Sequence, residues 1–308
     1  MDRLKIRLGK IRMRTPLIAV SGVFGLEYSK FVPDLSCVGA VVSKSVTLHP
    51  RQGNPRPRVI ETPAGLLNAI GLQNPGINAF IEQEIPKLRT LEVPIITSVA
   101  GASIDEYVQC SKLLAQRDEI DAIELNVSCP NVEMGEMEFG TDPIVLEQLV
   151  TSVRRVLGGK TLIVKLTPNI TDIVVPAQAA INGGADVISL INTLHGMAID
   201  LKTRKPKLGN QVGGLSGRAI HPVAVYMVHR CYTLCCRDHQ IPIIGIGGVS
   251  EYQDAMELIL AGATCVGIGT AMFLDDRVFE KIAKEMDEYV ASQGESYISS
   301  LVGKAAYS

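Results

Sequence analysis

The sequence predicts an α/β protein with a (β/α)8 architecture, the TIM barrel, and three observations support this prediction. Short β-rich runs recur along the 308 residues, and each is almost continuously apolar, as strands covered on both faces of a parallel sheet are. Amphipathic stretches with helical spacing separate most of these runs. About eight strand-and-helix units in ~300 residues match the repeat number and size of such a barrel. A doubly wound sheet is the alternative.

The order of the predicted elements follows from the same patterns. Residues 1–14 alternate apolar and basic positions around Gly9, which predicts an N-terminal β-hairpin that serves as a lid or floor. The predicted strands cover residues 17–22, 40–46, 94–101, 122–130, 162–168, 186–193, 242–248 and 265–270. The predicted helices cover residues 28–35, 103–117, 143–157, 170–182, 223–236 and 251–261. Since no domain boundary is visible, residues 1–308 are expected to form a single domain.

Two connections are longer than the others, residues 47–76 after the second strand and residues 194–217 after the sixth. Both are rich in Gly, Pro and Asn, and both exceed the usual length of a connection in a compact domain. We therefore expect long binding or lid loops over the C-terminal face of the barrel.

Composition excludes several classes of protein. A net charge of −2 lacks the basic footprint of a nucleic-acid-binding protein. The sequence has neither a signal-peptide pattern nor ~18 consecutive apolar residues. Seven cysteines without regular spacing fit a reducing cytosol better than a disulfide framework. We expect a cytoplasmic protein that binds neither nucleic acid nor membrane.

Polar residues gather where the predicted strands end. Barrel enzymes place their sites at these C-terminal ends, so the side chains there are expected to converge on one face. The residues concerned are Ser21, Lys44, Ser98, Asn126, Lys165, Asn192, Gly247 and Gly269.

The fourth of these strand ends carries a thiol among polar neighbours. Asn126, Ser128 and Asn131 surround Cys129, and Pro130 stiffens the segment. Carboxamides both donate and accept hydrogen bonds, so they can bind a planar, amide-rich ligand. The alternative is that Cys129 is a small core residue, but burying its polar neighbours without partners is costly.

Glycines at the last two strand ends, Gly245–Gly248 and Gly267–Thr270, favour a phosphate site. Backbone N–H groups in such loops can approach phosphate oxygens closely. Gly213, Gly214 and Gly217 can add donors, and ordinary structural turns are the alternative.

Lys44 and Lys165 end otherwise apolar strands. A buried ammonium requires a counter-charge or a ligand. Lys165 can therefore either form an ion pair with Glu124 or stabilise negative charge on a ligand. The segment Leu66–Gly76, with its asparagines and glycines, is suited to wrapping a small polar ligand.

The remaining cysteines and histidines form no metal motif. Cys231, Cys235 and Cys236 lie in a predicted helix without a CxxC pair, so core packing is expected and no metal site. His195 follows Asn192 and Thr193 near the predicted site, whereas the other four histidines are expected to be structural or exposed.

Several motifs together resemble a known family over essentially the full length of the chain. They are SKSVTLHPRQGNPRPRV, NAIGLQNPG, LNVSCPN, VKLTPN, INT, GGLSG, IGIGGV and GIGT. The chain resembles the soluble, FMN-containing dihydroorotate dehydrogenases of class 1. The GLQNPG segment is similar to that of the NAD-linked 1B subgroup, whose catalytic subunit works with an electron-transfer subunit.

The resemblance implies that FMN is the cofactor, dihydroorotate the substrate, orotate the product, and Cys129 the catalytic base in this step of pyrimidine (UMP) biosynthesis. The base removes a proton from C5 while a hydride passes from C6 to the flavin. The implied FMN contacts are Ser21, Lys44, Ser45, Ser98, Asn126, Lys165, Ile191, Gly217, Gly247, Gly248, Gly269 and Thr270. The implied substrate contacts are Lys44, Asn68, Ala69, Ile70, Gly71, Leu72, Asn126, Asn192 and Thr193. Ser98 stands where the family pattern has Asn, which implies a weaker or water-mediated flavin contact.

The resemblance also implies a partner subunit with FAD and a [2Fe–2S] cluster that passes electrons to NAD+, with a homodimer inside a heterotetramer. The alternatives are a fumarate-linked class 1A enzyme, a dihydropyrimidine dehydrogenase-like flavoenzyme, and, less favoured, a dihydrouridine synthase. A non-redox phosphate-binding barrel is the alternative from a different class.

Overall fold

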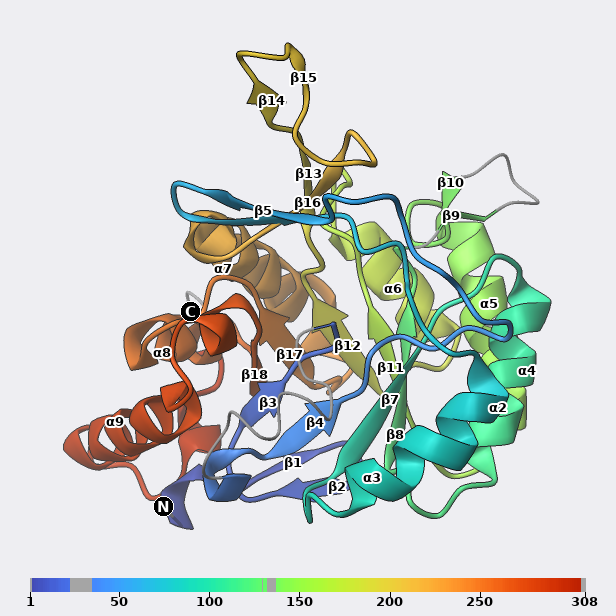
Figure 1. The fold of residues 1–308 in the computed structure, drawn as a ribbon. Coiled ribbons are helices and arrows are strands. Elements are labelled where there is room, and N and C mark those ends of the chain that lie inside the picture. The colour runs from blue at the N-terminus through green and yellow to red at the C-terminus, as the bar shows by residue number, and fades with distance from the viewer. Residues whose placement is uncertain (1, 23–34, 129, 132–136, 306–308) are drawn as a thin grey trace.

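The computed structural model describes residues 2–22, 35–128, 130–131 and 137–305. Eight parallel strands form a closed barrel (Figure 1). In chain order they are β3 (Leu17–Ala19), β4 (Ala40–Val42), β7 (Ile95–Val99), β8 (Ala122–Asn126), β11 (Thr161–Lys165), β12 (Val187–Leu190), β17 (Ile243–Ile246) and β18 (Cys265–Ile268). The predicted (β/α)8 barrel is confirmed. A doubly wound sheet is ruled out, because the last strand pairs with the first and leaves no edge.

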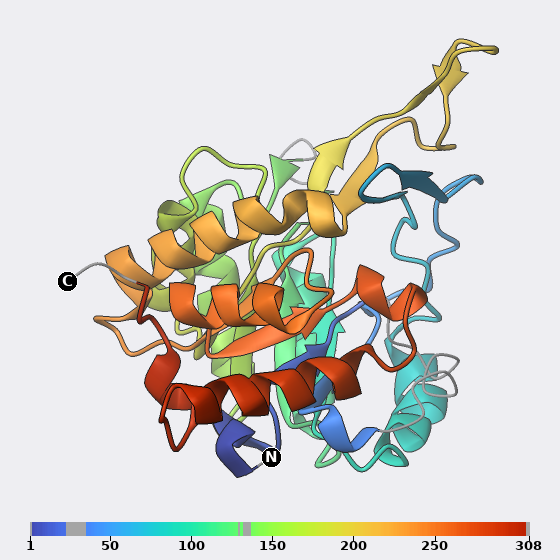
Figure 2. The ribbon, with the colours of Figure 1, turned by 90° about the vertical axis from the view of Figure 1, so that its left-hand side faces the viewer.

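Helices surround the barrel (Figure 2). They are α2 (Ile77–Ala79) with the π-helix η3 (Phe80–Glu84) and α3 (Ile85–Arg89), α4 (Ile104–Ala115), α5 (Pro143–Val156), α6 (Val174–Asn182), α7 (His221–Cys231) with the π-helix η6 (Tyr232–Cys236), α8 (Tyr252–Ala261) and α9 (Val278–Ser292). Short 3-10 turns are η1 (Asp2–Leu4), η2 (Leu35–Cys37), η5 (Arg218–Ile220), η7 (Thr270–Phe273) and η8 (Ile298–Leu301). The predicted helix 28–35 lies almost wholly outside the described residues.

Capping residues explain where two of the predicted helices begin. Ser103 accepts a hydrogen bond from the Glu106 N–H at the start of α4, and Asp142 accepts from two N–H groups at the start of α5. Such caps satisfy backbone donors that have no partner inside the helix. Within the described part of the chain, no helix has the length and apolar character needed to cross a membrane.

The N-terminal hairpin closes the bottom of the barrel. Its strands are β1 (Ile6–Leu8) and β2 (Ile11–Met13), which pair antiparallel. Leu8 and Met13 are buried in the same cluster as Ile163 and Ile244 from the barrel strands. Each fully buried side chain of this size stabilises the fold by about 1.5–3 kcal/mol. The hairpin is therefore a floor, and the opposite end carries the strand C-termini.

The two long connections pair with each other above that opposite end. They form a four-stranded sheet in the order β13 (Leu194–Gly196), β16 (Gly213–Ser216), β6 (Gly65–Asn68) and β5 (Val59–Thr62). The two long connections are present as predicted, and backbone N–H and C=O groups of one satisfy those of the other. A smaller hairpin, β14 (Ile199–Asp200) and β15 (Lys205–Pro206), projects from this sheet (Figures 1 and 2). A two-residue pair, β9 (Pro130–Asn131) and β10 (Met137–Glu138), follows β8.

Candidate functional site

A chain of hydrogen bonds links polar side chains at the ends of β4, β7, β8 and β12. The hydroxyls of Ser45 and Ser98 lie 3.0 Å apart, and Asn126 Nδ2 donates to Ser45 Oγ at 3.2 Å. Asn192 Nδ2 lies 3.1 Å from Asn126 Oδ1 and 2.8 Å from Ser128 Oγ. Side chains separated by up to 147 residues of sequence therefore share one network, as expected for the mouth of a barrel.

The barrel wall holds this network in place. Tyr107 on α4 donates its hydroxyl to the Asn126 carbonyl at 2.7 Å, and its ring packs edge-on against Phe139 at 5.4 Å. Ser98 is fully buried, and its hydroxyl forms a hydrogen bond with that of Ser45. The carboxamide of Asn126 is positioned by a rigid strand end, which is a suitable base for binding a planar ligand.

Lys165 is the buried cation of the site. Its side chain at the end of β11 is 6% exposed, and Nζ donates to Ser21 Oγ at 3.3 Å. Glu124 is buried as well, but it forms no ion pair with Lys165, and its Oε1 atom has no hydrogen-bond partner among the described residues. The alternative of an internal salt bridge is therefore wrong. A buried ammonium without a carboxylate partner favours a negatively charged ligand.

Lys44 is not the buried cation that the sequence predicted. The strand β4 ends at Val42, so Lys44 lies beyond it and its side chain is exposed. The prediction of a buried ammonium is wrong for Lys44. Ser43, the residue after the strand, is buried instead, and its hydroxyl accepts a hydrogen bond from the Ser98 N–H at 3.2 Å.

The predicted phosphate glycines form a cradle at the ends of β17 and β18, which are neighbours in the barrel. Gly217, Gly247 and Gly248 have φ values of 98°, 145° and 71°, which L side chains rarely adopt. The N–H groups of Gly248 and Gly269 have no acceptor within the described residues. Thr270 Oγ1 donates to Ser216 Oγ at 2.9 Å. Unpartnered donors beside the start of a helix suit a phosphate group.

Side chains would fill this cradle. A Cβ atom at Gly247 would come within 2.6 Å of Ala224 Cβ and 3.5 Å of Ile191 Cγ1, and one at Gly248 within 2.9 Å of the Gly217 carbonyl oxygen. The glycines are therefore required by close packing as well as by φ. Ile191, which is buried, lies beside Gly247.

We predict that Gly248→Ala lowers the free energy of unfolding by about 1–3 kcal/mol more than Gly158→Ala. Both glycines have positive φ values, 71° and 57°, so both variants carry the same kind of backbone penalty. Only at Gly248 does the new Cβ meet neighbours, since none lies within 4 Å at Gly158. Urea unfolding of the two variants measures the difference, and equal losses would contradict the cradle.

The implied substrate segment lies on the sheet above the barrel mouth. Asn68 Nδ2 donates to the Gly214 carbonyl at 3.3 Å, and a Cβ at Gly214 would collide with Thr193. Gly214 therefore lies between Asn68 and Thr193. Ala69 is buried and Ile70 is exposed, while Gly71 and Leu72 have positive φ values of 74° and 54°.

Asn74 has a structural role, which the sequence prediction missed. Its Nδ2 donates to Thr47 Oγ1 at 2.8 Å, and its Oδ1 accepts from the Gly76 N–H at 2.9 Å. Asn74 thus holds the loop closed and leaves no carboxamide for a ligand. His195 is exposed, and its backbone N–H donates to Asn169 Oδ1 at 2.9 Å.

The cysteines divide into one unplaced thiol and six buried ones. Cys129 lies outside the described residues, between Ser128 and Pro130. The other six are buried, and desolvation raises the pKa of Cys110 to about 12. The predicted core packing of Cys231, Cys235 and Cys236 is confirmed. A thiol whose pKa is raised in this way is unreactive at neutral pH, whereas hydrogen bonds with Cys231 and Cys236 lower the pKa of Cys235 to about 4.

One residue of the site was missed by sequence reasoning. His221 is buried, and its Nδ1 lies 2.8 Å from the Gly247 carbonyl oxygen. A lone histidine has no diagnostic spacing. The only available signal was its place at the start of a helix, just after the glycine motif that ends at Gly217.

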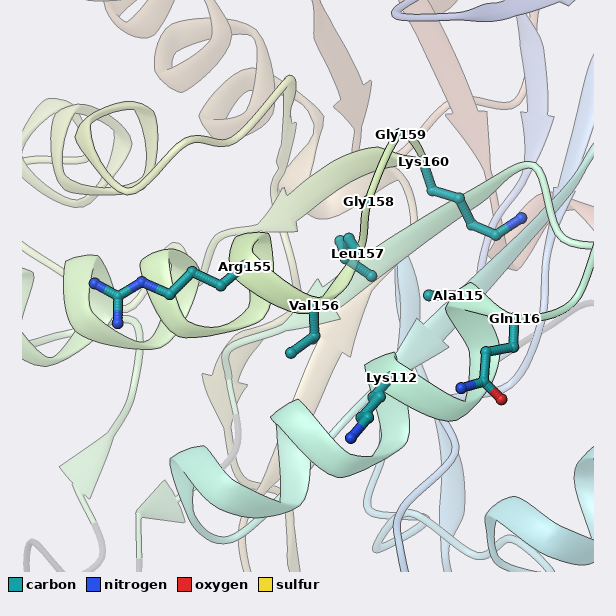
Figure 3. Close-up of a pocket in the computed structure, with 9 residues that line it drawn as sticks. All are labelled: Lys112, Ala115, Gln116, Arg155, Val156, Leu157, Gly158, Gly159 and Lys160. Atoms are coloured by element: carbon teal, nitrogen blue, oxygen red, sulfur yellow. The ribbon is translucent and has the colours of Figure 1, made fainter.

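A shallow hollow of about 590 Å³ lies elsewhere, between the C-terminal ends of α4 and α5 (Figure 3). Lys112 and Arg155 are among its lining residues, and Lys160 donates to the carbonyls of Arg117 and Ile120 at 2.8 and 2.6 Å. Lys160 precedes β11, so the hollow lies at the N-terminal end of the strands. It holds no pair of groups suited to acid–base chemistry.

The chain is similar to known proteins over almost its whole length. A family model described as dihydroorotate dehydrogenase matches residues 3–290. Proteins named dihydroorotate dehydrogenase B (NAD(+)), catalytic subunit, are similar over 302 residues, which is 97% of this chain and 97% of each relative. The identity is 48% for the protein of Trichlorobacter lovleyi, 46% for that of Citrifermentans bemidjiense and 47% for that of Geotalea daltonii.

Proposed function

From the premise that the chain belongs to the dihydroorotate dehydrogenase family, we propose that its barrel mouth holds FMN and oxidises dihydroorotate to orotate in pyrimidine biosynthesis. The observation that carries this proposal is Lys165, a buried ammonium with no carboxylate partner among the described residues. An anionic, electron-accepting ring beside it would supply the missing partner.

The glycine cradle would hold the phosphate of FMN. Its unpartnered N–H groups and left-handed glycines fit a group with several acceptor oxygens and no room for side chains. The proposed phosphate contacts are Gly217, Gly247, Gly248, Gly269 and Thr270. The proposed contacts to the flavin ring are Ser21, Lys44, Ser45, Asn126, Lys165 and Ile191. Ser98, which is fully buried, would support Ser45 from behind through their hydrogen bond.

The substrate would lie over that ring, under the sheet formed by the two long connections. Carboxamides from Asn126 and Asn192 are already joined by a hydrogen bond, so they present a fixed pattern of donors and acceptors. Lys44, exposed at the mouth, supplies positive charge for the substrate carboxylate. The proposed substrate contacts are Lys44, Asn68, Ala69, Ile70, Gly71, Leu72, Asn126, Asn192 and Thr193.

Cys129 is proposed as the base that removes the proton from C5 of dihydroorotate. The thiol has an ordinary pKa of ~8.5, and the thiolate is the form that accepts a proton. Bound FMN would accept the hydride from C6. Ser128, the residue before Cys129 in the sequence, is held by its hydrogen bond with Asn192 and so belongs to the polar network.

Electrons are proposed to leave through a separate subunit with FAD and a [2Fe–2S] cluster that reduces NAD+. The basis is the name shared by the relatives, which specifies both a catalytic subunit and NAD(+). The assembly would be a homodimer of this chain within a heterotetramer. NADH formation by the chain together with its partner supports this route, and efficient fumarate reduction by the isolated chain contradicts it.

The test of the proposed reaction is the absorption spectrum of the purified chain under anaerobic conditions. We expect bound FMN, identified after release from the protein, and loss of its visible absorbance when dihydroorotate is added. Dihydrouracil lacks the carboxylate and is expected to leave the spectrum unchanged. Equal bleaching by both compounds would contradict the substrate, and a preparation that binds no flavin would contradict the redox assignment.

A further inference from the structure

His221 contacts the glycine cradle from behind. It is the first residue of α7, its side chain is about nine-tenths buried, and Nδ1 lies 2.8 Å from the Gly247 carbonyl oxygen. A carbonyl oxygen can only accept a hydrogen bond, so Nδ1 is the donor. A Cβ at Gly248 would lie 2.7 Å from His221 Cβ. One side chain therefore touches both glycines at the end of β17.

The other side of the ring faces α8. His221 Nε2 lies 3.1 Å from Glu257 Oε2, and Asp254 Oδ1 lies 3.9 Å away. Near this contact, Arg218 forms an ion pair with Glu251 at 2.6 Å. The beginning of α7 is thus tied to α8, and His221 is the link that continues from α8 to the glycine cradle.

The direction of the Gly247 carbonyl decides where the next donor points. The C=O of one residue and the N–H of the next belong to the same planar trans peptide and point in opposite directions. Because the Gly247 carbonyl is held toward His221, the Gly248 N–H is directed away from it. That N–H has no acceptor within the described residues.

We propose that His221 is a positioning residue for the phosphate of the cofactor: by holding the Gly247 carbonyl, it keeps the Gly248 N–H aimed at the phosphate. This inference rests on the proposed function, in which the cradle binds the phosphate of FMN. His221 does not touch the phosphate itself. Its effect should therefore depend on the phosphate and not on the flavin ring.

The test compares FMN with riboflavin, which has the same ring and no phosphate. The full chain, freed of flavin, is titrated with each compound, and quenching of flavin fluorescence reports binding. His221→Ala is expected to weaken FMN binding by about tenfold, the value of one hydrogen bond, and to leave riboflavin binding unchanged. His221→Asn, whose amide nitrogen can replace Nδ1, is expected to restore most of the loss. His239→Ala is the matched control, since His239 also contacts a backbone carbonyl, that of Cys235, but is exposed and lies beyond the C-terminal end of η6.

The outcomes separate the inference from the function on which it rests. If His221→Ala weakens both ligands equally, or neither, while the unaltered chain prefers FMN, the positioning role is overturned and the phosphate site stands. If the unaltered chain binds FMN no better than riboflavin, the phosphate site itself is wrong, and the role of His221 is overturned with it. A loss confined to FMN and rescued by Asn supports the inference.

Discussion

Cys129→Ala is expected to keep its flavin and to lose turnover of dihydroorotate by ~10²–10⁴-fold, the usual contribution of a positioned general base. Alanine removes the only group proposed to accept the C5 proton. Flavin binding should be unchanged, because Cys129 is not among the proposed phosphate and ring contacts. Stopped-flow measurement of flavin bleaching by dihydroorotate, together with the flavin content of the purified variant, tests both halves of this prediction.

A buried cysteine provides the control for Cys129→Ala. Cys265→Ala removes a thiol from β18 that is fully buried and whose pKa is raised by desolvation. It is expected to lower stability without a comparable loss of flavin reduction, because it reaches no ligand. Near-normal bleaching in Cys129→Ala would remove the assignment of the base.

Lys165→Met is expected to make the reduction potential of the bound flavin more negative by about 30–60 mV, which is ~1.4–2.8 kcal/mol for two electrons. Turnover should fall by about 10- to 100-fold. The physical reason is that a buried ammonium stabilises negative charge on the ring more strongly than water would. Spectroelectrochemical titration measures the potential, and steady-state kinetics measure turnover.

Lys165→Met is not expected to lower the stability of the fold, although it lowers turnover. Lys165 has no carboxylate partner among the described residues, so methionine of similar volume should leave the unfolding free energy of the flavin-free chain unchanged or raised. Lys160→Met is the matched control at the other end of β11, where Nζ donates only to backbone carbonyls. It should not move the potential. An unaltered potential in Lys165→Met would show that the ammonium does not face the flavin.

The barrel was predictable because each strand is covered on both faces. That burial requires an almost unbroken apolar run, and the change to polar residues marks the end that faces the site. Asn126 and Lys165 were located in this way, and the structure places them at paired positions on β8 and β11. The same reasoning failed at Lys44, because the apolar run of residues 40–46 continues past the end of the strand at Val42.

The sheet above the barrel mouth and the contacts of His221 could not be predicted, because they depend on contacts between segments that are distant in sequence. The strands β6 and β16 pair although Asn68 and Gly214 are 146 residues apart, and each is too short and too rich in glycine to show a clear alternation. His221 was missed for a related reason, since its role comes from the carbonyl of Gly247 and the carboxylate of Glu257. Neither partner is adjacent in sequence, so no local pattern could reveal them.

A crystal structure of the chain with FMN and orotate would decide whether the proposed site is correct. We expect the phosphate on the N–H groups of Gly248 and Gly269, the ring beside Lys165, and the sulfur of Cys129 within about 3–3.5 Å of C5 of orotate. A sulfur that points away from the pyrimidine, or a phosphate bound outside the glycine cradle, would contradict it.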